Sequence, residues 1–147
     1  MFKLFKVSIV TIGLFFLFTL SVNAQNDTLI LIANEKGAPN QMSKSFTRKV
    51  LKGQRPRWKN GSKVKLCLMK TSTPSGIKTA KDYYNMNVRQ LNRYWLALVF
   101  QGKSTAPLFF RSEEKLIAYV MKTYGAIGII SKKNKGRAKE VTIATKK

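Results

Sequence analysis

The chain has 147 residues, of which 28 are basic and six acidic, with one cysteine and no histidine, so its formal net charge is +22 at pH 7. The lack of histidine excludes the usual general base near neutral pH, the Ser-His-Asp and Cys-His catalytic arrangements and most zinc sites, and a single cysteine excludes an intramolecular disulfide. So large an excess of positive charge predicts an anionic partner: inorganic anions, phosphorylated lipid headgroups or nucleic acid.

Residues 1–24 have the pattern of a cleavable signal peptide. Two lysines precede an apolar stretch at residues 7–20, and small or aliphatic residues stand where signal peptidase accepts them before a cut after Ala24. We expect a mature periplasmic chain of residues 25–147, whose net charge is +20 once Lys3 and Lys6 are removed. The alternative is a retained membrane anchor, but the apolar stretch is shorter than the about 20 residues that a spanning helix needs.

The first half of the mature chain predicts two strands with a helix between them. A continuous aliphatic run at residues 28–33 indicates a strand buried on both faces. Ser43 is a good N-cap for a helix over residues 44–51. Residues 63–69 alternate between apolar residues and lysines at their start, which indicates a second strand. Cys67 lies in that strand and is interpreted as a small core or half-buried residue rather than a reactive thiol.

The second half predicts helices followed by short strands. Asn87 and Gln90 form a capping box for the longest helix, whose wide apolar face should make it the main packing partner of the sheet. In the last helix two acidic residues at the start and Lys122 at the end favour the helix dipole, and Met121 is expected to face inward. The helices are expected at residues 77–84, 88–100 and 112–122, the strands at 126–130 and 141–144, and a basic loop at 132–139.

This order of elements predicts a single α/β domain. The mature chain is long enough for one compact core and too short for two. We place the core at about residues 28–131 and a basic C-terminal segment at residues 132–147. The six acids are scattered, and the chain contains neither a GxxxxGK[ST] nor a GxGxxG sequence, so we expect no enzyme activity, no cofactor and no metal.

The segment from Lys70 to Gly76 is the candidate anion site. A strand that runs into a Ser/Thr/Gly-rich turn at the start of a helix exposes amide hydrogens and hydroxyls that can surround an oxyanion. The alternative is that a hydroxyl merely caps the helix and the rest is a solvated turn. The donors are Thr71, Ser72, Thr73, Ser75 and Gly76, with Lys70 supplying charge.

Several motifs in order resemble the periplasmic phosphate-binding proteins of ABC transporters. They are the Ser-started helix from Ser43 to Gly53 with Trp58 and Asn60-Gly61 after it, then Phe100-Gln101-Gly102-Lys103 and Pro107, then Tyr124-Gly125-Ala126-Ile127-Gly128-Ile129. The likeness covers about residues 29–130. It implies one three-layer lobe of the type II binding-protein fold, with a mixed sheet flanked by helices, as in a short single-lobe member.

Carried over by position, the resemblance places Lys70 where the family has its phosphate-facing Arg, and Ser75 and Gly76 where it has Ser-Gly. Lysine lacks the two-pronged contact of a guanidinium. Ile77 stands in place of the family's phosphate-binding Thr, and the chain is long enough for only one of the two lobes that close around a ligand.

Two functions from different classes follow. The first is an exported solute-binding protein that holds phosphate or another small oxyanion and delivers it to the membrane component of an ABC transporter. The second is an envelope interaction protein that has kept the fold but lost the pocket, and whose basic surface, including residues 132–139, binds anionic lipid, an envelope polymer or a partner. Nucleic acid ranks last, because Tyr94, Trp95 and Phe100 lie at core spacing rather than on an exposed stacking face.

Overall fold

The computed structural model describes residues 27–144. The expected signal peptide, its cleavage after Ala24 and the last residues of the chain lie outside the described residues. Within residues 27–144, no helix has the length and apolar character needed to cross a bilayer.

The fold is built on a five-stranded sheet with the strand order β4-β3-β5-β1-β6. β3, β4 and β5 run parallel, whereas β1 is antiparallel to both β5 and β6. A separate two-stranded parallel pair joins β2 to β7. The sheet strands are β1 (Leu29–Ala33), β3 (Lys65–Met69), β4 (Leu108–Phe110), β5 (Ala126–Ser131) and β6 (Lys139–Glu140), and the pair is β2 (Gln41–Ser43) with β7 (Thr142–Ala144).

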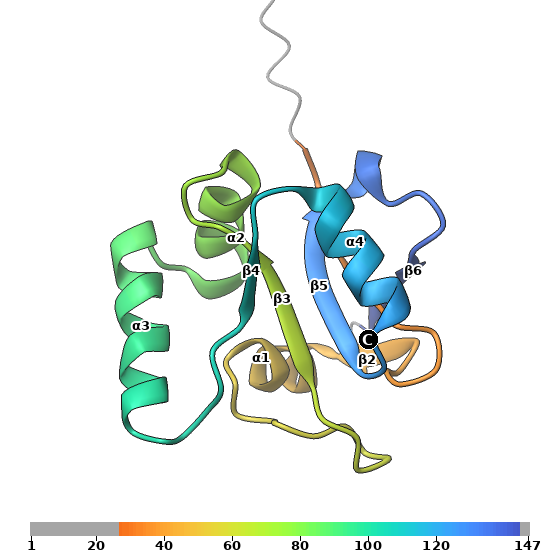
Figure 1. The fold of residues 1–147 in the computed structure, drawn as a ribbon, viewed down its shortest axis with the longest axis horizontal. Coiled ribbons are helices and arrows are strands. Elements are labelled where there is room, and N and C mark those ends of the chain that lie inside the picture. The colour runs from red at the N-terminus through yellow and green to blue at the C-terminus, as the bar shows by residue number, and fades with distance from the viewer. Residues whose placement is uncertain (1–26, 145–147) are drawn as a thin grey trace, which may run out of the picture.

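Helices cover both faces of the sheet, which gives three layers (Figure 1). On one face α2 packs Ala80 and Tyr84 against a cluster that contains Leu68. On the other face α4 packs Leu116 and Val120 against a cluster that contains Cys67. The helices are α1 (Lys44–Leu51), α2 (Pro74–Tyr84), α3 (Val88–Phe100) and α4 (Glu113–Lys122), followed by the short 3₁₀ helix η1 (Lys132–Asn134). The predicted α/β fold with a mixed sheet between helices is therefore confirmed.

Local capping explains why the starts of α1 and α3 could be predicted from the sequence. The Ser43 hydroxyl accepts a hydrogen bond from the Phe46 amide and so starts α1 at Lys44. Asn87 and Gln90 form the expected capping box, with the two reciprocal bonds at 2.8 and 2.9 Å, and α3 spans the expected residues 88–100. Both helix predictions are confirmed to the residue.

α2 begins earlier than expected, at Pro74 instead of residue 77. Thr73 is its N-cap, and proline is compatible with the first turn of a helix because the amide hydrogen that it lacks has no partner there. The shift matters for the candidate site, because it places Ser75 and Gly76 inside the helix rather than in the turn before it.

The expected role of α3 is wrong: α4, not α3, packs most closely on the sheet. In α3 only Leu91 and Trp95 are buried, and Phe100, which was expected to lie at core spacing, is 82% exposed. Met121 in α4 was also expected to face inward but is exposed. Figure 1 shows α3 standing at the margin of the domain beside α2 rather than across the sheet.

The C-terminal segment extends the core beyond residue 131. Lys139–Glu140 pairs with β1 as the edge strand β6, and Ala138 and Val141 are buried. The expected last strand forms as β7, but it pairs with β2 outside the main sheet. The short strands β2, β4 and β6 were not expected from the sequence, because each has three residues or fewer and therefore no visible period.

Candidate anion-binding site

The candidate site lies at the carboxyl ends of the parallel strands β3 and β4. β3 ends at Met69 and its chain turns into α2 on one face, whereas β4 ends at Phe110 and its chain turns into α4 on the other face. The Lys70 amide donates to the Phe110 carbonyl at 2.8 Å and ties the two strand ends together. In α/β sheets, ligands bind in the crevice where the connections of neighbouring strands depart to opposite faces. The Lys70–Gly76 turn therefore occupies the position at which this topology presents a ligand site.

Thr73 holds the turn in shape. Its amide and its hydroxyl both donate to the Lys70 carbonyl, at 2.9 and 2.7 Å. The same hydroxyl accepts from the Gly76 amide at 3.1 Å, which is the N-cap bond of α2. Thr73 and the Gly76 amide are thus engaged with the protein itself.

Gly76 is required by lack of space rather than by backbone conformation. A Cβ added at this position would lie 2.0 Å from the Lys70 carbonyl oxygen and 3.0 Å from the Met69 carbonyl oxygen. The first turn of α2 therefore lies directly on the end of β3. This close approach brings the amino end of α2 to the strand edge.

Ser75 faces a carboxylate. Its hydroxyl donates to Glu113 Oε1 at 2.6 Å, and the Ser131 amide donates to the same oxygen at 3.1 Å. Asn134 Nδ2 donates to Glu113 Oε2 at 2.6 Å. One carboxylate in the first turn of α4 therefore accepts hydrogen bonds from a hydroxyl of α2, from the amide at the end of β5 and from a side-chain amide of η1. From the sequence, Glu113 was interpreted only as a dipole-compensating residue, and no local signal pairs it with Ser75, 38 positions away.

The other half of the turn keeps free donors. The amides of Thr71 and Ser72 have no acceptor within residues 27–144. They lie beside a shallow hollow of about 250 Å³, which Lys70, Asn92 and Phe109 also line. The Thr71 hydroxyl is 3.3 Å from Asn92 Oδ1 and links the turn to α3. Asn92 was not expected at the site, and its signal in the sequence is only a polar position on the exposed side of α3.

The structure therefore separates the six predicted residues into two groups. Lys70, Thr71 and Ser72 line the hollow, whereas Thr73, Ser75 and Gly76 make hydrogen bonds to protein groups. The capping interpretation applies to Thr73, and the exposed-donor interpretation fits the residues before it. Part of the turn is therefore engaged with protein groups, and the other part lines the hollow.

Cys67 lies two residues before the end of β3, in the core cluster beneath α4. Its side chain is fully buried, and burial raises the pKa of the thiol to about 12. The half-buried alternative for Cys67 is wrong and the core alternative is confirmed, because α4 covers the strand face that was expected to expose lysines. Within the described residues, no group of His, Cys, Asp and Glu could hold a metal ion.

Positive charge dominates the described surface. Residues 27–144 contain 24 of the 28 basic residues and all six acidic ones. Within this part of the chain, three ion pairs form: Lys78–Asp82, Lys133–Asp27 and Lys135–Glu140. The hydrogen bond from Lys133 lowers the pKa of Asp27. Most cations thus face solvent without a carboxylate, which favours the approach of anions from a distance.

No protein-family model matches the chain, and no curated protein matches it by sequence. Solved structures do match its fold. An ABC-type phosphate transport receptor from Vibrio cholerae superposes with a TM-score of 0.53 at 14% identity, covering 82% of this chain and 48% of the receptor.

Two further structures agree with this match. PstS from Borrelia burgdorferi gives a TM-score of 0.57 at 16% identity, covering 82% of this chain and 49% of PstS. A possible phosphate binding protein from Planctomyces limnophilus DSM 3776 gives 0.53 at 14%, covering 80% and 42%. The chain thus spans about half the length of the proteins it matches. Its described residues have the fold of one part of a phosphate receptor.

Proposed function

We propose that the protein is an exported solute-binding protein that holds phosphate or a related oxyanion at the turn after β3. The observation that carries the proposal is the pair of unoccupied amides of Thr71 and Ser72 beside Lys70, at the point where α2 and α4 depart to opposite faces. Backbone amides and an ammonium group are the donors that oxyanions prefer. The fold shared with phosphate receptors supports the proposal of the same class of solute.

The proposed roles differ along the turn. Lys70 supplies the charge, Thr71 and Ser72 supply amide hydrogens, and Asn92 adds a side-chain amide from α3. Thr73, Ser75 and Gly76 hold the turn and the start of α2 in place. Because the hollow is shallow and residues 27–144 place no second lobe over it, we expect these residues by themselves to bind weakly and reversibly.

The place of action follows from the signal-like N-terminus. We propose cleavage after Ala24 and a periplasmic mature protein of residues 25–147, without enzyme activity. A membrane component of an ABC transporter is the proposed recipient of the solute, since one matching structure is described as an ABC-type phosphate transport receptor. The mass and N-terminal sequence of the protein isolated from an expressing bacterium test the cleavage directly.

Calorimetric titration with inorganic phosphate tests the site. Replacing Lys70 with alanine removes the charge at the turn, and the matched control Lys65→Ala removes the same charge from the exposed start of the same strand. We expect the Lys70 variant to bind phosphate about tenfold more weakly, as for loss of one charge-assisted hydrogen bond, and the Lys65 variant to bind like the wild type. Equal affinities for the two variants, or no binding heat with millimolar phosphate in the wild type, would refute the proposal.

A second candidate is an envelope interaction protein, favoured by the many cations without a partner in residues 27–144. The exposed cations of the 132–139 segment include Lys132, Lys133 and Arg137. Co-sedimentation with phosphatidylglycerol vesicles at low and high salt distinguishes the two functions, because surface charge attraction is screened by salt. Nucleic acid has less support: Phe100 is the one strongly exposed aromatic of α3, and a single ring does not form a stacking platform.

A further inference from the structure

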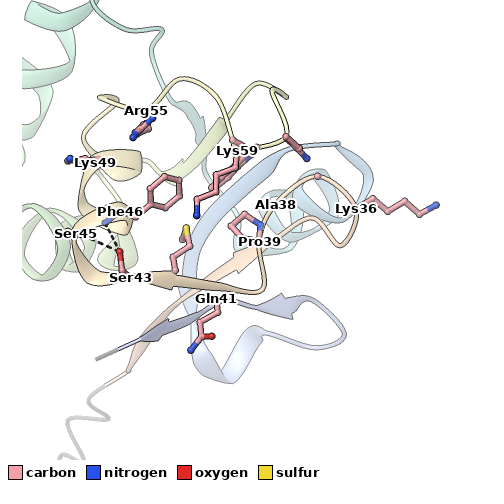
Figure 2. A pocket seen from close by; sticks show the side chains of 14 residues that line it. Lys36, Ala38, Pro39, Gln41, Ser43, Ser45, Phe46, Lys49, Arg55 and Lys59 are labelled. Atoms are coloured by element: carbon pink, nitrogen blue, oxygen red, sulfur yellow. Dashed lines mark hydrogen bonds between the residues drawn. The ribbon is translucent and has the colours of Figure 1, made fainter. Parts of the chain in front are cut away.

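A larger pocket lies at the opposite end of the sheet from the Lys70 turn. Its volume is about 600 Å³, within the range of small-molecule sites in proteins. Three segments form its walls: the loop after β1, the β2–α1 connection, and the loop that carries Trp58 (Figure 2). It adjoins the amino ends of β3 and β5, because the Trp58 indole donates to the Gly125 carbonyl at 2.9 Å and the Lys65 amide donates to the same carbonyl at 3.1 Å.

The floor of the pocket is apolar. Met42 and Trp58 are only 3% and 4% exposed, and the Phe46 ring lies 6.3 Å from the Trp58 ring. Figure 2 shows the Phe46 ring pointing into the space between α1 and the segment of Lys59. Ala38 and Pro39 complete the apolar wall. An apolar ligand group would replace water on these surfaces, which is favourable.

The rim of the pocket is cationic. Its charged lining residues are Lys36, Lys49, Arg55 and Lys59, all exposed, and no acidic residue lines the pocket. The Arg55 guanidinium lies 5.8 Å from the centre of the Phe46 ring, so charge and apolar floor meet at one edge. The sequence explains the lack of acids, because no Asp or Glu occurs between Glu35 and Asp82.

We propose that this pocket binds a small soluble organic anion that has an apolar body. The pocket has buried apolar groups at its floor and exposed cations at its rim. This arrangement fits a ligand whose apolar body enters the pocket and whose carboxylate, sulfonate or phosphate stays at the rim. A lipid held in a bilayer presents its headgroup first, which is the reverse order. Inorganic phosphate would leave the apolar floor unused.

A second copy of the protein and the protein's own N-terminal segment are less suitable ligands, because both are positively charged like the rim of the pocket. A second copy carries the same excess of positive charge. The apolar N-terminal segment is preceded by Lys3 and Lys6. Like charges brought together at a site without acids oppose either contact.

The test uses naphthalene-2-sulfonate as the probe, with 2-naphthol as its uncharged counterpart and inorganic sulfate as the anion without a body. Each is titrated by calorimetry at pH 7 into the protein as the expressing cells accumulate it, with its N-terminus defined by mass spectrometry. We expect the sulfonate to bind at least about tenfold more tightly than either 2-naphthol or sulfate, since each of these retains only one of the two interactions. Equal binding of 2-naphthol, or equal binding of sulfate, would overturn the proposed ligand class.

Matched variants place the ligand in the pocket. The double replacement Lys49→Gln, Arg55→Gln removes two rim charges, and Arg93→Gln, Lys103→Gln removes two exposed charges outside the pocket. We expect the first pair to lose about tenfold or more in sulfonate affinity and the second pair to keep it. Since net charge changes equally, equal losses would mean attraction by the whole surface and would overturn the site.

A third variant, Ser45→Trp, fills the pocket from an exposed lining position and should abolish binding while thermal melts show the fold intact. Retained binding in this folded variant would also overturn the site. Binding to phosphatidylglycerol vesicles is measured for the wild type and for Lys49→Gln, Arg55→Gln. If the two proteins bind the vesicles differently but bind naphthalene-2-sulfonate equally, the rim is a lipid-binding surface and the proposed ligand class is wrong. The proposal is independent of the Lys70 turn, whose phosphate titration has its own outcome.

Discussion

Ser75 and Glu113 join the first turns of α2 and α4 through a hydrogen bond of 2.6 Å from the serine hydroxyl to Glu113 Oε1. The same carboxylate accepts from the Ser131 amide and the Asn134 side chain. The donors are a hydroxyl, a strand-end amide and a side-chain amide, which are groups that can also bind a free oxyanion. At this edge of the sheet, these three donors are therefore already occupied by the carboxylate of Glu113.

Replacing Glu113 with alanine should lower the stability of the protein and make that stability respond to added oxyanions. Three donors lose their acceptor, so we expect the unfolding free energy to fall by about 1–3 kcal/mol. Added sulfate or phosphate should then raise the melting temperature of the variant more than that of the wild type, because a free oxyanion can take the vacated position. The matched control is Glu114→Ala, which removes an exposed carboxylate of the same turn. Identical anion responses of Glu113→Ala and Glu114→Ala would contradict this interpretation.

Gly76→Ala should destabilise the fold strongly. The new Cβ would lie 2.0 Å from the Lys70 carbonyl, so α2 must move away from the end of β3, at a cost of about 3 kcal/mol or more. Gly61→Ala is the comparison: its φ is +83°, but nothing lies within 4 Å of the added Cβ, and only about 1 kcal/mol is expected. Urea unfolding of both variants measures the contrast, and a milder effect at Gly76 would show that the turn adjusts freely.

Cys67 should resist alkylation in the native protein. The side chain has no exposed surface, and burial raises the pKa of its thiol to about 12, so little thiolate is available at pH 8. We expect iodoacetamide to modify the thiol only after urea unfolds the chain, as mass spectrometry would reveal. Rapid modification of the folded protein would mean that α4 opens locally from the sheet face that contains Cys67.

Tyr83 should make stability depend on pH in the alkaline range. Burial raises the pKa of its hydroxyl from 10.0 to about 12, and the hydroxyl donates to the Leu29 carbonyl at 3.2 Å. The stabilisation is therefore fully present below pH 10 and is lost as the pH rises towards 12. The measured quantity is the difference in unfolding free energy between wild type and Tyr83→Phe. A difference that stays constant from pH 9 to pH 12 would contradict the assignment, and using a difference cancels the titration of the lysines.

The sequence was sufficient to predict the helices and strands that have a local signal, such as a capping residue or a continuous apolar run. Ser43 and the Asn87–Gln90 box set the starts of α1 and α3, and the aliphatic run of β1 indicated a strand covered on both faces. Short pairings such as β2 with β7 depend on residues about 100 positions apart, so no local period reports them. Phe100 shows an error in assigning the period: it lies about two and a half turns after the buried Leu91, on the opposite side of α3, where Leu96 is also exposed.

The candidate site was predicted in part for the same reason. The Lys70–Gly76 turn was found from its hydroxyl and glycine content, and the structure does place it at the diverging ends of β3 and β4. Which of its donors remain free could not be predicted, because that depends on Glu113, which reaches Ser75 only through the tertiary fold. The pocket around Phe46 was missed, since its lining comes from three segments without a common motif.

Gly125 is a single anchor point for two walls of that pocket. Its carbonyl holds the Trp58 indole, and its backbone lies so close to Gly37 that a Cβ on Gly37 would meet the Gly125 nitrogen at 2.2 Å. The Trp58 floor and the Gly37 loop of the pocket are thus both fixed against Gly125 in the protein without a ligand. Because the pocket is preorganised, binding does not lose the entropy of ordering these loops. We therefore expect the affinity of a ligand to depend on its shape and charge, and its association to need no slow conformational step.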